Sequence, residues 1–327
     1  MSPEEENKIL VVRDLKVYYY TMRGIVKAVD GVSFSIGYGE NLALVGESGS
    51  GKSTLGYALM NLVLPPGRIV GGEVFIAGTD ILALRGHDLR KARGSLVSIV
   101  FQDPFTTLDP VKKVGDQLTE VLIEHGLSKK EAQERVIEVI EAVGLPEGAA
   151  KSYPHQLSGG QRQRISIAAA IALRPKVLVA DEPTTALDVI VQKQIMDLID
   201  KVRDLGTSVV LITHDIALAA ERADKIAVMY AGKIVEFGSK NEVIRKPLHP
   251  YTKALLASVP TLSGSKWPQP IPGFPPDLIN PPPGCRFHPR CREKVGKCEE
   301  LEPPLIHVGK GHYVSCWLYF RGGDNGG

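Results

Sequence analysis

The sequence predicts an α/β protein with a mostly parallel sheet, followed by a C-terminal extension of different character. Over the first 240 residues, short apolar runs rich in β-branched residues alternate with helical stretches, a pattern typical of parallel sheets. Beyond residue 240 lie most of the 23 prolines and all 4 cysteines. We therefore expect one domain over residues 1–240 and an extension over residues 241–327.

The apolar runs indicate where the strands lie. Buried strands are expected from continuous apolar runs at residues 41–45, 177–180, 208–213 and 225–229. Flanking segments are expected to pair antiparallel, at residues 11–20, 25–36 and 72–76. Ala231-Gly232 favours a hairpin turn after the last buried strand.

A helical insertion is expected at about residues 103–173. Ser128 and Glu131 have the spacing of a capping box, which marks the first turn of a helix. Apolar residues then recur at helical spacing as far as Gly144, which should end the helix.

The charge balance argues against a nucleic acid as the main ligand. Lys and Arg number 39 and Asp and Glu 37, so the net charge is +2 and there is no basic excess. No apolar run approaches the roughly 20 residues that a bilayer-spanning helix needs. The acidic start of the chain argues against a secretory signal. We therefore expect a cytosolic protein that does not itself cross a membrane.

The strongest motif is a phosphate loop after the predicted strand at 41–45. It matches G-x-x-x-x-G-K-[ST] and consists of Gly46, Glu47, Ser48, Gly49, Ser50, Gly51, Lys52 and Ser53. Backbone N–H groups of such a loop cradle phosphates, while the lysine reaches the β- and γ-phosphates and the hydroxyl ligates Mg²⁺. We therefore expect these residues, with Thr54, to bind a nucleoside triphosphate.

Two acidic residues follow the predicted strand at 177–180, at the sheet edge where α/β proteins bind ligands. Asp181 is expected to hold the Mg²⁺ shell. Glu182 is expected to orient and deprotonate the attacking water, because phosphoryl transfer depends on positioning and charge stabilisation. Hydrolysis is therefore favoured over transfer to a second substrate.

Between these motifs, Leu157-Ser158-Gly159-Gly160-Gln161 precedes a predicted helix and offers a second N–H-rich anion site. With this order of motifs, residues 9–240 resemble the ATP-binding cassette (ABC) ATPases. The resemblance implies an ABC-type P-loop domain with a mixed sheet core, an antiparallel β subdomain and a helical subdomain. It also implies that Ser158, Gly159, Gly160 and Gln161 grip ATP held by a partner cassette.

Further positions match that family one by one. The resemblance assigns Gln102 to Mg²⁺ and the attacking water, His214 to the γ-phosphate and Asp188 to communication across the dimer. Each also has a plainer reading, because polar residues at strand ends commonly cap helices or make structural hydrogen bonds. The expected catalytic residues are thus Lys52, Gln102, Glu182 and His214, and the expected Mg²⁺ ligands are Ser53, Gln102 and Asp181.

An aromatic residue of the first predicted strand is expected to stack on adenine. The resemblance points to Tyr19, and its neighbours Tyr18 and Tyr20 remain alternatives. Packing is the commoner role of a tyrosine in a strand.

The extension resembles that of the dipeptide and oligopeptide permease ATPases, on residues 249–256 and 282–291. The aromatic and proline residues of 249–256 are interpreted as a packing clamp without a chemical role. All nucleotide motifs precede residue 215, so ATP binding by the isolated subunit is expected to survive the change of Cys291 to Ser.

Cysteine occurs only in the extension, at Cys285, Cys291, Cys298 and Cys316. Clustered thiols in a reducing cytosol favour a metal centre over disulfides. The spacing matches neither the usual zinc pairs nor the common ferredoxin runs, so it leaves the metal open. The resemblance implies a [4Fe–4S] cluster, with zinc, disulfides or free thiols as alternatives.

Together these resemblances imply the ATP-hydrolysing subunit of an importer for dipeptides, oligopeptides or similar solutes, on the cytoplasmic face of the membrane. The implied partners are a second ABC ATPase subunit, usually a homologous different chain, two transmembrane permease subunits and an external solute-binding protein. The alternative is a soluble ABC ATPase associated with ribosomes or DNA. The short separation of Lys52 and Ser158 argues against DNA-repair members, and a single phosphate loop argues against translation factors.

Overall fold

The computed structural model describes residues 7–185, 187–259 and 268–320, and the chain divides into two compact units. The first unit comprises Met1–Leu10, Ile36–Gly39 and Phe75–Leu211. The second unit comprises Val11–Ser35, Glu40–Val74 and Ile212–Gly327. Each unit is therefore made from segments that are far apart in the sequence.

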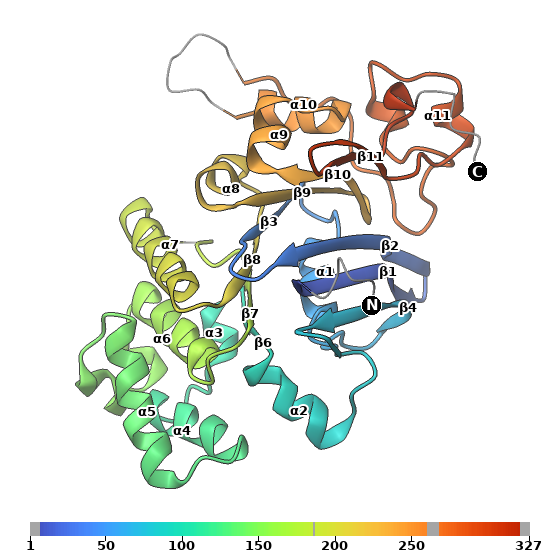
Figure 1. The fold of residues 1–327 in the computed structure, drawn as a ribbon. Coiled ribbons are helices and arrows are strands. Elements are labelled where there is room, and N and C mark those ends of the chain that lie inside the picture. Colours follow the sequence, from blue (N-terminus) through green and yellow to red (C-terminus); the bar gives the residue numbers. More distant parts are fainter. Residues whose placement is uncertain (1–6, 186, 260–267, 321–327) are drawn as a thin grey trace. The chain divides into compact units, whose positions relative to one another are not determined.

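The first unit combines parallel strands with a group of helices (Figure 1). Its strands lie in the order β8-β7-β6, and β6 runs parallel to β7 with Val97 opposite Val177. Its elements are β5 (Thr79–Asp80), α2 (Gly86–Ser95), β6 (Val97–Val100), α3 (Pro104–Thr107), α4 (Val114–Glu124), α5 (Lys129–Ala142), α6 (Gly159–Ile171), β7 (Val177–Asp181), α7 (Val189–Asp204) and β8 (Ser208–Thr213), whose last two residues belong to the second unit.

The helix predicted to begin at Ser128 forms within the segment expected to be helical. Ser128 Oγ accepts a hydrogen bond from the Glu131 N–H at 3.3 Å, and Glu131 Oε2 accepts one from the Ser128 N–H at 2.9 Å. The helix that they start, α5, ends at Ala142, just before Gly144 with φ +74°. It packs against α4 and α6. The predicted capping box and helix end are confirmed.

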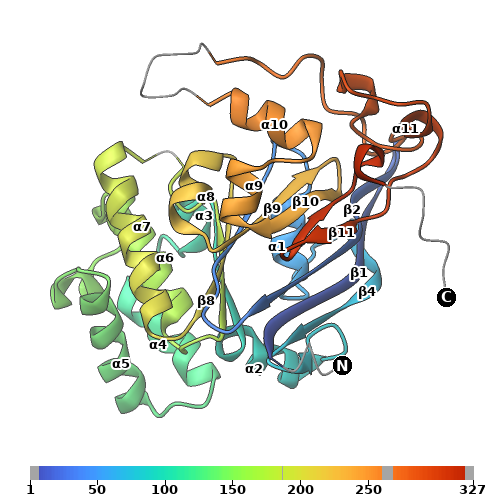
Figure 2. The same ribbon diagram turned by 45° about the horizontal axis from the view of Figure 1, so that its top comes forward.

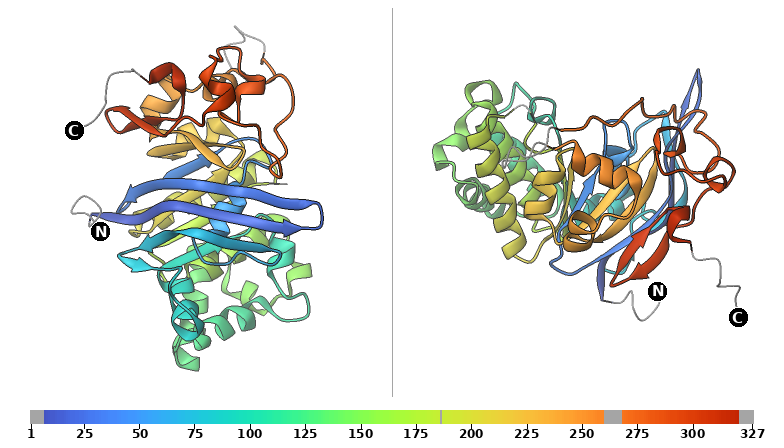
Figure 3. Two further views of the ribbon diagram at one scale, coloured as in Figure 1. Left: turned by 90° about the vertical axis from the view of Figure 1, so that its right-hand side faces the viewer. Right: turned by 90° about the horizontal axis from the view of Figure 1, so that it is seen from above.

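The second unit contains antiparallel strands in the order β2-β1-β4 and a sheet segment in the order β11-β12-β10-β9-β3. The long strands β1 and β2, blue in Figure 3, lie side by side. The elements that begin in this unit or lie mostly within it are β1 (Lys8–Thr21), β2 (Gly24–Gly37), β3 (Leu42–Val45), α1 (Lys52–Ala58), β4 (Gly67–Ile76), α8 (Ile216–Arg222), β9 (Lys225–Tyr230), β10 (Lys233–Ser239), α9 (Lys240–Arg245), α10 (Pro250–Ala257), α11 (Lys297–Glu300), β11 (Ile306–Gly309) and β12 (His312–Val314).

The predicted hairpin between β9 and β10 is confirmed. The strands pair antiparallel, with Tyr230 opposite Lys233. The two turn residues, Ala231 and Gly232, have φ +47° and +83°, as a two-residue hairpin turn with left-handed backbone requires. The predicted strand at 208–213 coincides with β8, and the one at 225–229 lies within β9.

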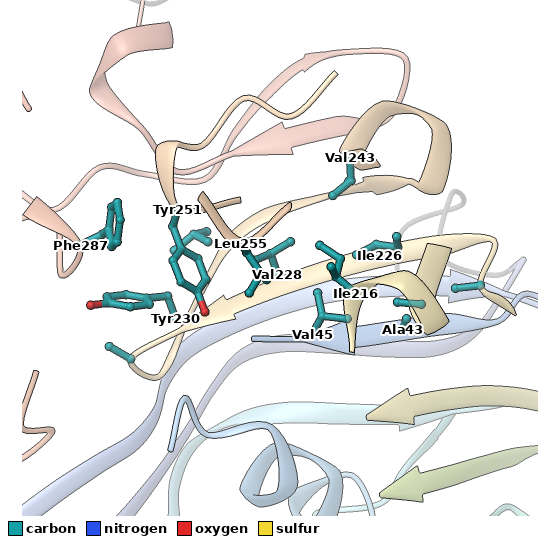
Figure 4. Packing of buried hydrophobic residues seen from close by; sticks show 14 residues of the cluster. Ala43, Val45, Ile216, Ile226, Val228, Tyr230, Val243, Tyr251, Leu255 and Phe287 are labelled. Atoms are coloured by element: carbon teal, nitrogen blue, oxygen red, sulfur yellow. The ribbon is translucent and has the colours of Figure 1, made fainter. Parts of the chain in front are cut away.

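The extension joins the main sheet segment of the second unit, which the sequence did not predict. β12 pairs antiparallel with β10, with Val314 opposite Glu236, and β11 pairs with β12. Figure 2 shows this red hairpin beside β10. A buried core shared by cassette and extension includes Val45, Val228, Tyr251 and Phe287 (Figure 4). Within the described ranges, no helix is both long enough and apolar enough to span a bilayer.

Candidate nucleotide site and cysteine segment

The phosphate loop connects β3 to α1 in the second unit. Gly46 has φ +155°, and a Cβ at this position would meet the Met229 carbonyl oxygen at 2.1 Å. Gly51, the N-cap of α1, has φ +102°, and its Cβ would lie 2.1 Å from the Ala28 carbonyl oxygen. The loop therefore needs glycine at both positions, for backbone conformation and for space.

Lys52 is buried beneath this loop, with 5% of its surface exposed. Its Nζ donates to the Gly46 oxygen at 2.8 Å and to the Glu47 oxygen at 2.9 Å. Ser48 and Gly49 form the exposed side of the loop. The ammonium group is therefore held against the loop backbone, where it adds positive charge to a loop suited to phosphate.

The consecutive tyrosines of β1 have different surroundings. The Tyr18 hydroxyl donates to Asp30 Oδ1 at 2.6 Å, and Tyr20 is 44% exposed. The Tyr19 hydroxyl lies 3.4 Å from Oγ1 of Thr54, in the first turn of α1. Tyr19 is therefore the tyrosine of this group that contacts the phosphate-loop helix.

Two of the predicted catalytic residues meet in the first unit. Oε2 of Glu182 accepts a hydrogen bond from Gln102 Nε2 at 3.2 Å and another from Thr185 Oγ1 at 3.0 Å. Glu182 also has φ +44°, a left-handed conformation that is uncommon outside glycine and recurs at functional sites. The preceding residue, Asp181, ends β7 and is fully buried. One carboxylate oxygen of Glu182 is therefore oriented by two donors.

Thr185 is a site residue that the sequence analysis missed. Its N–H donates to the Glu182 carbonyl oxygen at 3.1 Å, so the two residues close one turn. A hydroxyl three positions after an acidic residue in a turn is the signal that could have found it.

The predicted second anion site, Leu157 to Gln161, leads into α6. Ser158 is the N-cap, and its Oγ accepts from the Gln161 N–H at 3.3 Å while Gln161 Oε1 accepts from the Ser158 N–H at 2.9 Å. A Cβ on Gly160 would lie 2.7 Å from Val191 Cγ1, whereas one on Gly159 would find its nearest neighbour at 3.8 Å. Gly160 is therefore required by packing against α7, and the contact with a partner's ATP stays a prediction.

Asp188 and His214 lie at element boundaries. Asp188 caps α7, because its Oδ1 accepts from the N–H groups of Ile190 and Val191 at 3.1 and 3.0 Å. His214 is exposed and directly follows β8, in the second unit. The helix-cap reading of Asp188 is therefore realised, and the nucleotide roles of both residues stay predictions.

The four cysteines are free thiols that line one small cavity in the second unit, together with His249 and Phe287. Burial raises the pKa of Cys285 to about 12 and that of Cys316 to about 11, and the neighbouring thiols add to both shifts. Without a cation the thiols of Cys285 and Cys316 therefore stay protonated at neutral pH. Within the described residues, no group of three or more His, Cys, Asp or Glu is arranged to hold a metal ion.

The extension also contacts the phosphate loop, a contact that the sequence analysis did not predict. Arg290 donates from Nη1 to Glu47 Oε2 at 2.7 Å and from Nη2 to Glu47 Oε1 at 3.0 Å. The Glu47 N–H donates to the Tyr251 hydroxyl oxygen at 2.9 Å. Tyr251 is fully buried in the core cluster, as the packing-clamp interpretation of residues 249–256 predicts, and its hydroxyl also holds the loop backbone.

Comparison with known proteins agrees with this architecture. Residues 29–185 match the family described as ABC transporter, and residues 235–298 match the family described as oligopeptide/dipeptide transporter, C-terminal region. The oligopeptide transport ATP-binding protein OppD of Bacillus subtilis (strain 168) is 47% identical over 95% of this chain and 89% of its own length. The dipeptide transport ATP-binding protein DppD of the same organism is 46% identical over 95% of each chain.

Solved structures of ATP-binding cassettes have the same fold as the cassette of this chain. A dimeric ATP-binding cassette in a post-hydrolysis state, bound to ADP and phosphate, superposes with a TM-score of 0.63 at 31% identity. The match covers 71% of this chain and 98% of that one. The predicted ABC-type fold class is confirmed, and ATP binding and hydrolysis follow from the family. The chain therefore belongs to the ATP-binding proteins of ABC transporters, in their oligopeptide and dipeptide branch.

Proposed function

We propose that this ATPase powers the import of oligopeptides or dipeptides through separate membrane permease subunits. The observation that carries the proposal is the extent of the similarity. The peptide transport ATP-binding proteins match 95% of the chain, including the extension, whereas the solved cassette covers 71% of it. The extension is thus the part that distinguishes the peptide branch from cassettes in general.

We propose that the phosphate loop and Lys52 bind the β- and γ-phosphates of ATP, with Mg²⁺ held by Ser53, Gln102 and Asp181. The buried ammonium beside the loop carbonyls supports the role of Lys52. Carboxylate, amide and hydroxyl oxygens suit Mg²⁺, which supports the proposed ligands. The bound Mg²⁺ would neutralise charge that develops on the phosphates during transfer.

Glu182 is proposed as the general base. The bonds from Gln102 and Thr185 support this role, because two donors fix the orientation of the carboxylate that would accept the proton. His214 is proposed to contact the γ-phosphate, and Tyr19 to stack on adenine, supported by its contact with Thr54.

A second cassette is proposed to complete each site. Ser158, Gly159, Gly160 and Gln161 would grip the ATP of the partner, and Asp188 would communicate across the interface. The helix start of α6 supports this, since backbone N–H groups at a helix N-terminus favour anions. The related solved cassette is itself dimeric.

The remaining partners are proposed to be two transmembrane permease subunits and an external solute-binding protein. The subunit would work at the cytoplasmic face of the membrane. Residues 241–327 would be the extension specific to this branch, appended to a cassette at 1–240 that carries its helical subdomain at 103–173.

Purification of the tagged full chain from detergent-solubilised membranes tests this function. We expect hydrophobic permease subunits and a second cassette to co-purify. We also expect the ATPase rate of the reconstituted assembly to rise with a peptide-loaded binding protein outside. Recovery of ribosomes or DNA in place of membrane proteins would instead establish the alternative of a soluble ABC ATPase.

We further propose that Cys285, Cys291, Cys298 and Cys316 hold a [4Fe–4S] cluster. The supporting observation is that these thiols, from distant positions in the extension, line one cavity. The cluster would cross-link a proline-rich segment with little regular structure.

Replacing one of these ligands is expected to remove the cluster. Protein purified without oxygen should be brown, with iron and sulfide in near-equal amounts, and Cys291→Ser should lose most of both. Residues 268–320 should then become sensitive to protease, because the cross-link is gone. A colourless preparation with stoichiometric zinc would contradict the cluster, and a metal-free preparation with full protease resistance would contradict any metal.

A further inference from the structure

The contact between the extension and the phosphate loop is a bidentate charge pair. Arg290 and Glu47 share two N–H···O bonds, and their side chains are 5% and 25% exposed. Such a pair fixes orientation as well as distance, because the planar guanidinium uses two donors at once. Glu47 is the second residue of the loop. Its orientation therefore influences the path of the backbone that would face a phosphate.

A second contact holds the main chain of the same loop residue. The Glu47 N–H donates to the Tyr251 hydroxyl oxygen at 2.9 Å. The Tyr251 ring is fully buried, with its centroid 4.6 Å from that of Tyr230 and 5.3 Å from that of Phe287 (Figure 4). Because the ring is fixed by this packing, its hydroxyl offers the loop an acceptor in a fixed position.

Arg290 is in turn anchored in the cysteine segment. It ends the short 3-10 helix His288–Arg290, and its Nε donates to the Pro272 carbonyl oxygen at 2.8 Å. The next residue, Cys291, donates its N–H to the His288 oxygen at 3.2 Å. The position of the guanidinium therefore depends on the fold of the segment that carries the four thiols.

We propose that Arg290 and Tyr251 are positioning residues for the phosphate loop, so that the folded extension raises the affinity of the cassette for ATP. This inference rests on the proposed role of the loop in phosphate binding. A loop that binds an anion through its backbone loses affinity to ordering unless its conformation is already fixed. By linkage, bound ATP must stabilise the extension by the same factor by which the extension favours ATP.

The competing interpretation is that the ion pair only stabilises the fold. The two interpretations differ in what ATP does. If the ion pair only stabilises the fold, removing it lowers the stability of the nucleotide-free protein but leaves the ATP affinity of the folded protein unchanged. A positioning contact changes the affinity itself, and makes nucleotide binding and protection of the extension depend on each other.

The test measures Mg·ATP affinity and nucleotide-free thermal stability for the full chain, purified without oxygen. Arg290→Met should weaken ATP binding about ten-fold, a typical size for coupling between sites. Arg290→Lys keeps the charge but loses the bidentate geometry. Its affinity for ATP should therefore lie between that of the wild type and that of Arg290→Met. Arg292→Met is the matched control, since Arg292 is exposed two residues away, and should bind ATP like the wild type.

Proteolysis supplies the reciprocal measurement. Saturating Mg·ATP should slow cleavage within residues 268–320 in the wild type and should protect Arg290→Met much less. If Arg290→Met melts earlier but binds ATP with unchanged affinity, or if ATP protects both proteins equally, the positioning role is overturned. If Lys52→Ala binds ATP as tightly as the wild type, the proposed phosphate-loop function has failed instead.

If Arg290→Met does not fold, variants of Glu47 and Tyr251 test the positioning role in its place. Glu47→Gln weakens the pair from the loop side, where the side chain is partly exposed. Tyr251→Phe removes the acceptor of the Glu47 N–H and keeps the buried ring. Both should weaken ATP binding several-fold, and wild-type affinity in both would overturn the proposal.

Discussion

Glu182→Gln is expected to keep ATP binding but to lose hydrolysis by about 10²-fold or more, because general-base assistance is typically worth that much. The substitution preserves size and removes only the ability to accept a proton. Gln102 and Thr185 can still donate to the remaining amide oxygen, so the left-handed turn at residue 182 should persist. The measurement is single-turnover ATP hydrolysis by the assembled transporter.

Glu134→Gln is the matched control for this experiment. It is the same exchange on an exposed residue of α5, where Glu134 forms a long ion pair with Lys130 at 3.9 Å. We expect it to hydrolyse ATP at the wild-type rate. A Glu182→Gln enzyme that also turned over at that rate would show that another group takes the proton.

The same variant should trap the dimer, because ATP that is bound but not hydrolysed keeps both cassettes together. Sedimentation with Mg·ATP should show association of Glu182→Gln with a partner cassette or with itself. A monomer at every ATP concentration, with the partner chain present, would contradict a composite site.

Gly51→Ala is expected to abolish most nucleotide binding and to destabilise the fold by roughly 2–5 kcal/mol. Left-handed backbone costs a residue with a Cβ about 1–2 kcal/mol, and crowding a packed site adds about 1–3 kcal/mol. The crowding here is against backbone, since the Cβ would lie 2.1 Å from the Ala28 oxygen. Either that carbonyl or the start of α1 must shift, which displaces the loop.

Gly49→Ala separates the cost of left-handed backbone from the cost of crowding. Gly49 also has a left-handed backbone, φ +76°, but nothing lies within 4 Å of its Cβ position. We expect it to show the conformational cost alone, and to retain ATP binding within a few-fold of the wild type. Equal losses in both variants, measured by denaturant unfolding and nucleotide titration, would show that the close approach to Ala28 has no effect of its own.

Local signals predicted much of the cassette correctly. Ser128 with Glu131 forms the predicted capping box, and Ala231-Gly232 forms the predicted hairpin turn. These succeed because each is decided by a few adjacent residues, through side-chain caps or through left-handed backbone. The resemblance placed Gln102 and Glu182 in one site, but the hydrogen bond between them was not predicted, because no local preference in the sequence indicates it.

The extension could not be predicted in the same way. β11 and β12 are four and three residues long, too short to show an alternating pattern, and they form because β10 offers a partner. The pair of Arg290 and Glu47 joins positions 243 apart, and nothing near either residue in the sequence indicates the other. Contacts of this kind are set by tertiary packing, which leaves no periodic trace in the sequence.

The pairing of β12 with β10 limits how far the chain can be shortened. Without residues 306–314, β10 would present unpaired backbone groups at Glu236 and Phe237, an edge that invites aggregation. The present edge is β11, a four-residue strand whose register with β12 is broken between His307 and Gly309. Short and irregular strands make poor templates for further pairing. The hairpin thus covers an edge of the sheet that could otherwise pair with a strand of another chain.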